Sequence, residues 1–171
     1  MFRFIIFLLI FSFNFCLANE FATINYEKIF QKSTAFQDIL KKVDNYKKEN
    51  LKKVQNIEKE LLKQKTNLDE SQMILSNEEF NKKIIEYENN VNNYQIEIDR
   101  INNNIYLGVE NSKKIIVDEV NLILKDIANE DNISIIFKED DYAIADKDID
   151  LSNRVIKILN NNLKELDISE F

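Results

Sequence analysis

Residues 80–105, FNKKIIEYENNVNNYQIEIDRINNNI, keep apolar side chains at strict steps of four and three, although the segment is crowded with Asn, a poor helix former. The repeated positions are Phe80, Ile84, Tyr87, Val91, Tyr94, Ile98, Ile101 and Ile105. This spacing places all eight side chains on one narrow stripe of a helix, which is the pattern of a coiled coil. A helix with so narrow an apolar stripe is marginal in water, so the segment requires a partner helix.

The partner is predicted upstream, in residues 36–68, where the same alternation holds and seven of ten positions are apolar. Those positions are Phe36, Leu40, Val43, Lys47, Asn50, Val54, Ile57, Leu61, Gln64 and Leu68. The pattern breaks over residues 69–77, and Ser76 followed by Glu79 has the spacing of a capping box, which predicts a new helix start. We therefore expect residues 36–108 to form an antiparallel helical hairpin whose first helix is roughly 60 Å long and projects from the rest of the chain.

Short β-like runs flank this hairpin and predict a small body built from residues 19–35 and 109–171. Residues 21–26 alternate like a strand, and residues 133–137 and 142–145 predict two more strands joined by a turn of acidic residues. Three strands are too few for a stable core, so we expect several copies of the chain to complete the body. The side chains expected there are Ile24, Tyr26, Ile133, Ile135, Phe137, Tyr142 and Ile144.

Helices are expected to join the arm to this body. Ser33 has the chemistry of an N-cap for the first long helix. Near Gly108 the apolar stripe moves to a displaced face, which indicates contact with a body; the glycine either serves that contact or is simply tolerated. From residue 151 to residue 166 the chain predicts a closing amphipathic helix, capped by Asp150 or Ser152.

Residues 1–18 have the features of a signal peptide, with Arg3 before an unbroken apolar run and a cleavage edge near Ala18. A lipoprotein signal with Cys16 as the lipidated residue is the main alternative. A retained anchor is the weaker one, because about 14 apolar residues fall short of the roughly 20 that span a membrane. Cleavage near Ala18 leaves a mature chain without cysteine, and hence an exported protein without disulfides.

Composition argues against most catalytic chemistry. The chain has one Gly and no His, Pro or Trp, so it lacks the residues of a glycine-rich phosphate loop and of Ser-His or Cys-His nucleophile pairs. We expect no enzyme activity, no cofactor and no metal site. The net charge of −7 also argues against a nucleic-acid partner.

Two groups are candidates for contacting a partner. Residues 41–65 hold nine Lys against four acids, and the side chains singled out are Lys47, Lys48, Lys52 and Lys53. The tip of the predicted hairpin holds Met73, Ile74 and Leu75. The lysines either attract acidic partners or form an ordinary solvated helix face, and the tip either binds partners or closes the hairpin.

The arrangement resembles the Skp family of periplasmic chaperones, also called the OmpH-like family, over residues 21–162. The resemblance is carried by ATINYEKIFQKS, by the two-helix arm and, most specifically, by the closing DNISIIFKEDDYAIADKDIDLSNRVIKILN. Within that block the motifs are YAIAD at 142–146, DIDLS at 148–152 and VIKIL at 155–159.

The resemblance implies a mostly α, α+β fold in which a long antiparallel coiled-coil hairpin is inserted into a small β body that forms a homotrimer. It further implies an ATP-independent periplasmic holdase that binds unfolded outer-membrane β-barrel proteins between its arms. A structural adaptor or spacer in the envelope, with one defined partner, is the alternative. Residues 59–83 balance five Lys against five acids, so attraction of the arm tips to an anionic membrane is not expected here.

Overall fold

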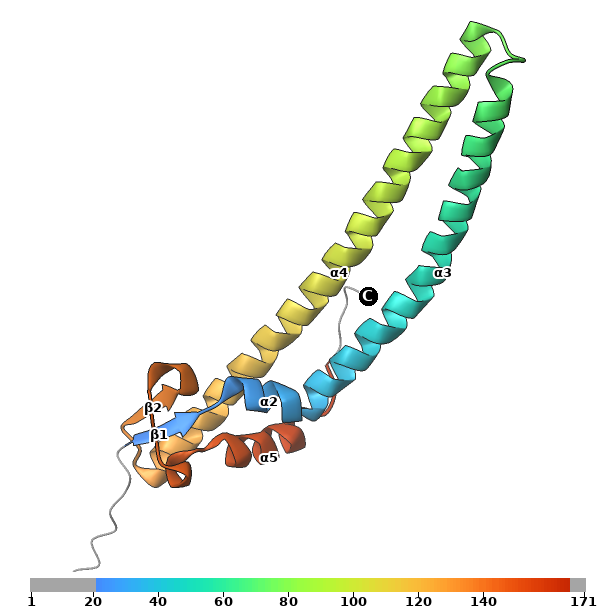
Figure 1. Cartoon of the computed structure of the whole chain (residues 1–171). Helices are drawn as coiled ribbons and strands as arrows, with labels where there is room; N and C mark the ends of the chain where they lie inside the picture. The colour runs from blue at the N-terminus through green and yellow to red at the C-terminus, as the bar shows by residue number, and fades with distance from the viewer. Residues whose placement is uncertain (1–20, 167–171) are drawn as a thin grey trace, which may run out of the picture.

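The structure, a computed structural model, describes residues 21–166 as a long two-helix arm on a small mixed body (Figure 1). The predicted signal peptide, residues 1–18, lies outside the described residues. The elements are β1 (Phe21–Ile24), α2 (Tyr26–Lys32), α3 (Thr34–Ser71), α4 (Asn77–Asp131), β2 (Ile135–Lys138), the 3-10 turns η2 (Glu139–Asp141) and η3 (Lys147–Ile149), and α5 (Ser152–Asn162). The mostly α, α+β fold class is confirmed.

Both long helices begin where the sequence predicts. The Ser33 hydroxyl accepts a hydrogen bond from the backbone N–H of Phe36 at 3.3 Å, which caps the 38-residue α3. Ser76 and Glu79 form a complete capping box at the start of the 55-residue α4. The hydrogen bond from the Ser76 hydroxyl holds the pKa of Glu79 below its usual range. Because α3 continues to Ser71, the turn at the tip is shorter than the predicted break.

The two helices pack along the predicted seam, but three of its positions are wrong. Ile39 is fully buried whereas Leu40 is 43% exposed, and Val91 is 39% exposed whereas the neighbouring Asn90 is half-buried. Lys47 is also exposed. A strict alternation of four and three assumes 3.5 residues per turn, and a helix of 3.6 residues per turn drifts away from it.

Polar side chains reinforce this seam. Tyr94 donates its hydroxyl hydrogen to Glu58 at 2.5 Å, and Asn90 donates to the Gln64 side chain at 3.0 Å. Nearer the body, the Asn104 amide donates to the Tyr46 hydroxyl at 3.1 Å. Such paired polar groups favour one register of the two helices over others, so some of the abundant Asn residues have a structural role.

The sheet of the body has two parallel strands, since Phe21 pairs with Ile135 and Ile24 pairs with Lys138. The predicted third strand at 142–145 is wrong, and residues 139–141 form the 3-10 turn η2 instead of a hairpin turn. The acidic segment carries no strong hairpin signal, and β2 finds its partner in β1 from the other end of the chain. A single bridge between Thr23 and Asp150 extends the sheet.

The core of the body lies where α2, α5 and the basal parts of α3 and α4 meet (Figure 1). Gly108 and Ser112, one turn apart on α4, are both buried, so Gly108 lies at a packed surface. Helix α5 ends at Asn162, earlier than predicted, yet Leu166 beyond it remains buried. The Leu166 carbonyl accepts a hydrogen bond from Lys42 at 2.6 Å, which ties the last described residue to the arm.

The side chains expected at an interface between copies divide into three groups. Ile24 is 2% exposed and belongs to the core of a single chain. Tyr26, Ile133 and Tyr142 are half-buried. Ile135, Phe137 and Ile144 are exposed, and these three remain available to another copy.

Candidate functional site

A groove of about 460 Å³, here called the arm groove, opens between α3 and α4 in the half of the arm nearer the body. Its apolar lining comes from Leu51, Val54, Ile98, Ile101 and Ile105. Its polar lining comes from Asp44, Lys47, Lys48, Asn50 and Asn102. The groove exists because α3 and α4 meet by only one narrow stripe each, so side chains beside that stripe are left uncovered.

The groove therefore combines an apolar floor with cationic groups. Ile101 is 7% exposed and forms its deepest part, whereas Leu51 is 54% exposed and stands at its side. Lys48 is paired with Asp44 at 2.5 Å, and Lys47 is a second cation of the lining. Such a surface binds apolar side chains without enclosing them, which suits weak and reversible contact.

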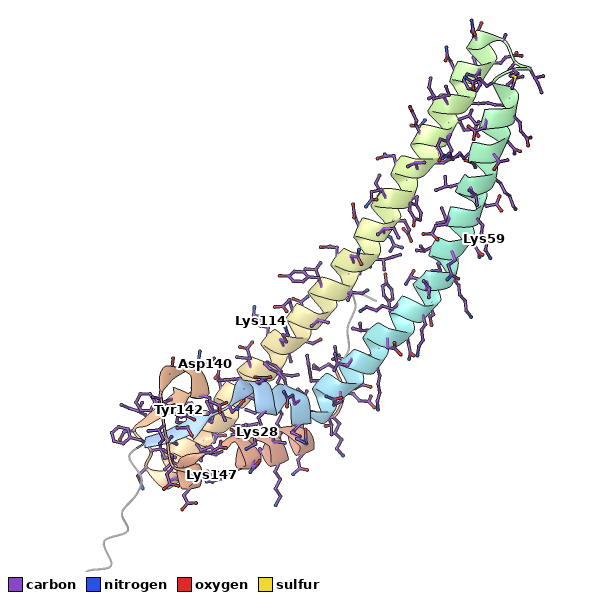
Figure 2. All side chains as sticks on the ribbon, in the orientation of Figure 1. Lys28, Lys59, Lys114, Asp140, Tyr142 and Lys147 are labelled. Carbon is purple, nitrogen blue, oxygen red and sulfur yellow. The ribbon has the colours of Figure 1, made fainter. Side chains whose placement is uncertain are left out.

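The four predicted lysines are not brought together. Lys47 and Lys48 line the arm groove, whereas Lys52 and Lys53 are exposed on α3 outside its lining. Lys53 lies close enough to Glu97 to contribute, after the dominant hydrogen bond from Arg100, to a pKa of Glu97 below its usual range. In Figure 2, Lys59 lies on the side of α3 turned away from α4, so the basic region extends around the helix.

The predicted tip cluster is also divided. Met73 and Ile74 are 96% and 81% exposed, whereas Leu75 is half-buried. Only Leu75 is placed to close the hairpin, and the two exposed residues leave an apolar surface at the end of the arm.

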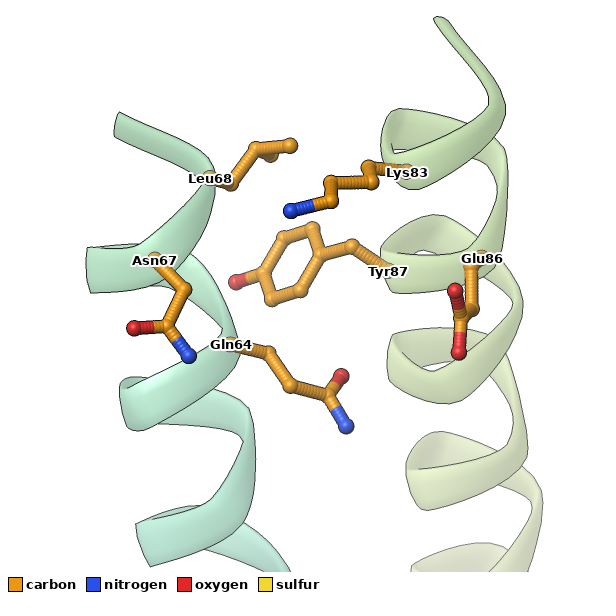
Figure 3. Close-up of a pocket in the computed structure, with 6 residues that line it drawn as sticks. All are labelled: Gln64, Asn67, Leu68, Lys83, Glu86 and Tyr87. Atoms are coloured by element: carbon orange, nitrogen blue, oxygen red, sulfur yellow. The ribbon is translucent and has the colours of Figure 1, made fainter. Parts of the chain in front are cut away.

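Two smaller hollows lie toward the tip. One of about 390 Å³ is lined by residues that include Ile57, Leu61 and Tyr94. The other, of about 160 Å³, is shown in Figure 3, where the Tyr87 ring projects from α4 toward Gln64 and Leu68 of α3. Its charged residues are Lys83 and Glu86, and it holds no nucleophile with an adjacent base.

Residues 21–166 contain no group of three or more acidic, His or Cys side chains placed to hold a metal ion. Within the same residues, no helix is both long and apolar enough to span a membrane.

Leu51 is the groove residue that the seam count missed. It follows the buried Asn50 directly, so a count of four and three passes over it. Asp44 and Asn102 were missed for a different reason, because a polar residue on a solvated helix carries no signal that a groove lies beside it.

Residues 20–159 match the family described as outer membrane protein (OmpH-like). Among solved structures, a proposed outer membrane chaperone (OmpH-like) from Caulobacter crescentus CB15 has a TM-score of 0.77 at 10% sequence identity. The match covers 88% of this chain and 89% of that chain, so the two share a fold along nearly their whole length. The search of curated proteins returned no significant match. Since the family match spans most of the sequence, this chain belongs to the OmpH-like family.

Proposed function

We propose that this chain is an ATP-independent holdase chaperone of the periplasm, which binds unfolded outer-membrane β-barrel proteins and keeps them from aggregating. The observation that carries the proposal is the arm groove, an apolar floor left open on a projecting rod. An unfolded β-rich chain aggregates through exposed apolar side chains and strand edges, and a groove of this kind covers them reversibly. Membership of the OmpH-like family and the shared fold with a proposed chaperone support the same role.

The proposed working unit is a homotrimer whose arms surround the client. Ile135, Phe137 and Ile144 are exposed on a body with only a two-stranded sheet, which supports completion of that body by other copies. Export across the inner membrane by the predicted signal peptide would deliver the chain to the compartment where such clients pass. The role needs no active site, in keeping with the shortage of catalytic residue types in the sequence.

Within this proposal the predicted contact residues have separate tasks. Lys47 and Lys48 attract acidic parts of a client to the groove, and Lys52 and Lys53 add to the local positive potential of α3. Met73, Ile74 and Leu75 provide a second, apolar contact at the tip.

The test is suppression of aggregation, without nucleotide, using several unrelated β-barrel proteins diluted from denaturant. We expect the chain lacking residues 1–18 to reduce light scattering for all of them at near-equimolar amounts of trimer. Protection of none of these clients would overturn the proposal. Protection of a single one would instead favour an envelope adaptor with one defined partner.

A further inference from the structure

Helix α3 contains an internal repeat of eleven residues that the alternation of four and three conceals. Residues 39–49, 50–60 and 61–71 read ILKKVDNYKKE, NLKKVQNIEKE and LLKQKTNLDES. The second residue of each repeat is Leu and the third is Lys. The leucines are Leu40, Leu51 and Leu62, and the lysines are Lys41, Lys52 and Lys63.

The repeated leucines lie on the surface of the arm, beside its seam. Leu40, Leu51 and Leu62 are 43%, 54% and 66% exposed. Eleven residues make three helical turns to within about 20°, so the three side chains lie in one row at intervals of about 16 Å. The packing of α3 on α4 does not need them, because the residue before each leucine takes the seam position. A single exposed leucine is ordinary, but three at one phase of a repeat form a regular row of separate apolar contacts.

The charge beside this row is positive. Lys41, Lys52 and Lys63 directly follow the leucines, and Lys48 and Lys59 lie on the same side of the helix, one or two turns away from them. All five are exposed, and Lys48 and Lys63 each also pair with an acid of their own helix, at 2.5 and 2.7 Å. A ligand that covers the leucines and carries carboxylates therefore meets complementary charge at every interval.

Helix α4 also carries exposed aliphatic side chains at this spacing, but the charged residues beside them differ from those on α3. Ile85 and Ile96 are also eleven residues apart and are each 57% exposed. Each is followed by an acid, Glu86 or Glu97. Lys82 lies one turn before Ile85 and Arg100 one turn after Ile96, so the charge beside this row is mixed. The row on α3, which has a lysine directly after every leucine, suits an acidic ligand better.

We propose that Leu40, Leu51 and Leu62, with the lysines that follow them, form a ladder of equivalent subsites for extended polypeptide segments in which apolar side chains stand beside carboxylates. Leu51 is both the middle leucine of this ladder and part of the lining of the arm groove, so the ladder continues the groove along α3. An extended chain advances roughly 3.3 Å per residue and its successive side chains point to opposite faces, so side chains six residues apart lie on one face and reach neighbouring leucines when the segment is slightly less than fully extended. This inference rests on the proposed chaperone function, to which it adds the chemistry and spacing of the bound segment.

The test measures binding of the full chain to a labelled synthetic peptide with Leu at every sixth position, Glu two residues after each Leu, and Ser elsewhere. We expect Leu51→Gln and Leu62→Gln each to raise the dissociation constant of the peptide about threefold. The double variant should raise it about tenfold, because each leucine adds a separate apolar contact. The matched control is Ile85→Gln with Ile96→Gln, expected to change it less than about twofold. Circular dichroism is the control for folding, and all variants are expected to keep their helices because every substituted side chain is exposed.

A peptide with Lys in place of Glu is expected to bind at least about tenfold more weakly, and added salt to weaken only the Glu peptide. Equal loss in the α3 and α4 variants, or equal binding of both peptides, would overturn the ladder. Binding of phosphatidylglycerol vesicles that depends on Leu51 and Leu62, without binding of the Glu peptide, would assign the row to a membrane surface and also overturn it.

The aggregation assay separates this inference from the proposed function. If the wild-type chain protects β-barrel clients and the Leu51, Leu62 double variant binds peptide and protects clients equally well, only the ladder fails. If the peptide results hold but no client is protected, only the chaperone function fails.

Discussion

Asp150 connects the start of α2 with the start of α5. Its carboxylate accepts hydrogen bonds from the backbone N–H of Ser152 at 2.8 Å and from the Ser152 hydroxyl, and it pairs with Lys28 at 3.0 Å. The Ser152 oxygen in turn accepts from the backbone N–H of Asn25 at 2.9 Å. Partial burial favours a higher pKa of Asp150, but the hydrogen bonds from Ser152 and Lys28 outweigh it and hold that pKa below its usual range.

We predict that Asp150→Asn lowers the free energy of unfolding by about 1–2 kcal/mol at neutral pH, a modest value because the side chain is 30% exposed. A carboxyl group whose pKa is lower in the folded protein stabilises it above the unfolded pKa of about 3.9, and this contribution is lost as the pH falls through the folded value. The difference between wild type and variant should therefore shrink in acid. Urea unfolding at several pH values measures it.

Asp148→Asn is the matched control, since it removes the same charge from an exposed position two residues away. A loss of stability as large in the control, or one that grows in acid, would contradict the assigned role of Asp150.

Single residues are predictable from sequence where their partners are local. The cap at Ser33 and the box of Ser76 with Glu79 are confirmed because each connects residues three apart in the chain. The caps predicted for α5, Asp150 or Ser152, are wrong, because its N-cap is Leu151, which makes no side-chain capping hydrogen bond. Asp150 instead accepts the N–H of Ser152, the first residue of the helix. Its pairing with Lys28 had no such signal, because 122 residues separate the two.

At the scale of elements, the arm depends on a seam that is buried only near the body. Ile39, Val43 and Ile101 are buried there, whereas Val54, Ile57 and Leu61 farther out are half-buried. The outer arm is therefore the less stable part, and its local opening does not require the body to unfold.

We predict that Leu61→Asp lowers the local stability of the outer arm by about 2 kcal/mol, because it places a carboxylate in a half-buried apolar seam. The neighbouring Leu62→Asp serves as control, since Leu62 is 66% exposed and should change local stability by no more than about 0.5 kcal/mol. Hydrogen exchange measures both, with faster exchange expected on α3 and α4 around Leu61 and unchanged exchange in α5. Equal effects of the two variants would mean that the seam does not hold the outer arm together.

The hairpin was predictable because a repeated stripe survives errors at single positions, as with Leu40 and Val91. The strand at 142–145 was not, because β-like runs show neither their partner nor their direction. Only the fold determines that β2 pairs in parallel with β1, and residues 142–145 are left as irregular chain. The arm groove was equally hidden, since its shape depends on how far two solvated helices stand apart.

At the scale of the molecule, the body has an apolar surface that one copy does not cover. Phe21 and Ile135 are each 47% exposed, Phe137 is 38% exposed and Ile144 is 90% exposed. The rings of Phe21 and Phe137 lie beside each other across the sheet, with centroids 6.2 Å apart. An exposed aromatic and aliphatic surface on so small a sheet supports assembly.

We predict that the chain lacking residues 1–18 sediments at about three times its monomer mass at micromolar concentration, and that Phe137→Asp dissociates it, because a charge in a buried interface is costly. Leu122→Asp is the control, since Leu122 is 60% exposed on α4 and should leave the mass unchanged. A folded monomer of wild-type protein in this measurement would refute the trimer.

The parallel pairing of β1 with β2 has a consequence for the order in which a newly made chain folds. Helices α3 and α4 meet across a tip turn, so their contacts begin locally, whereas β1 must wait for a strand that is synthesised after the whole of α4. Contacts between distant parts of a sequence form later than local ones. A nascent molecule is therefore expected to form its helical arm first and its body last.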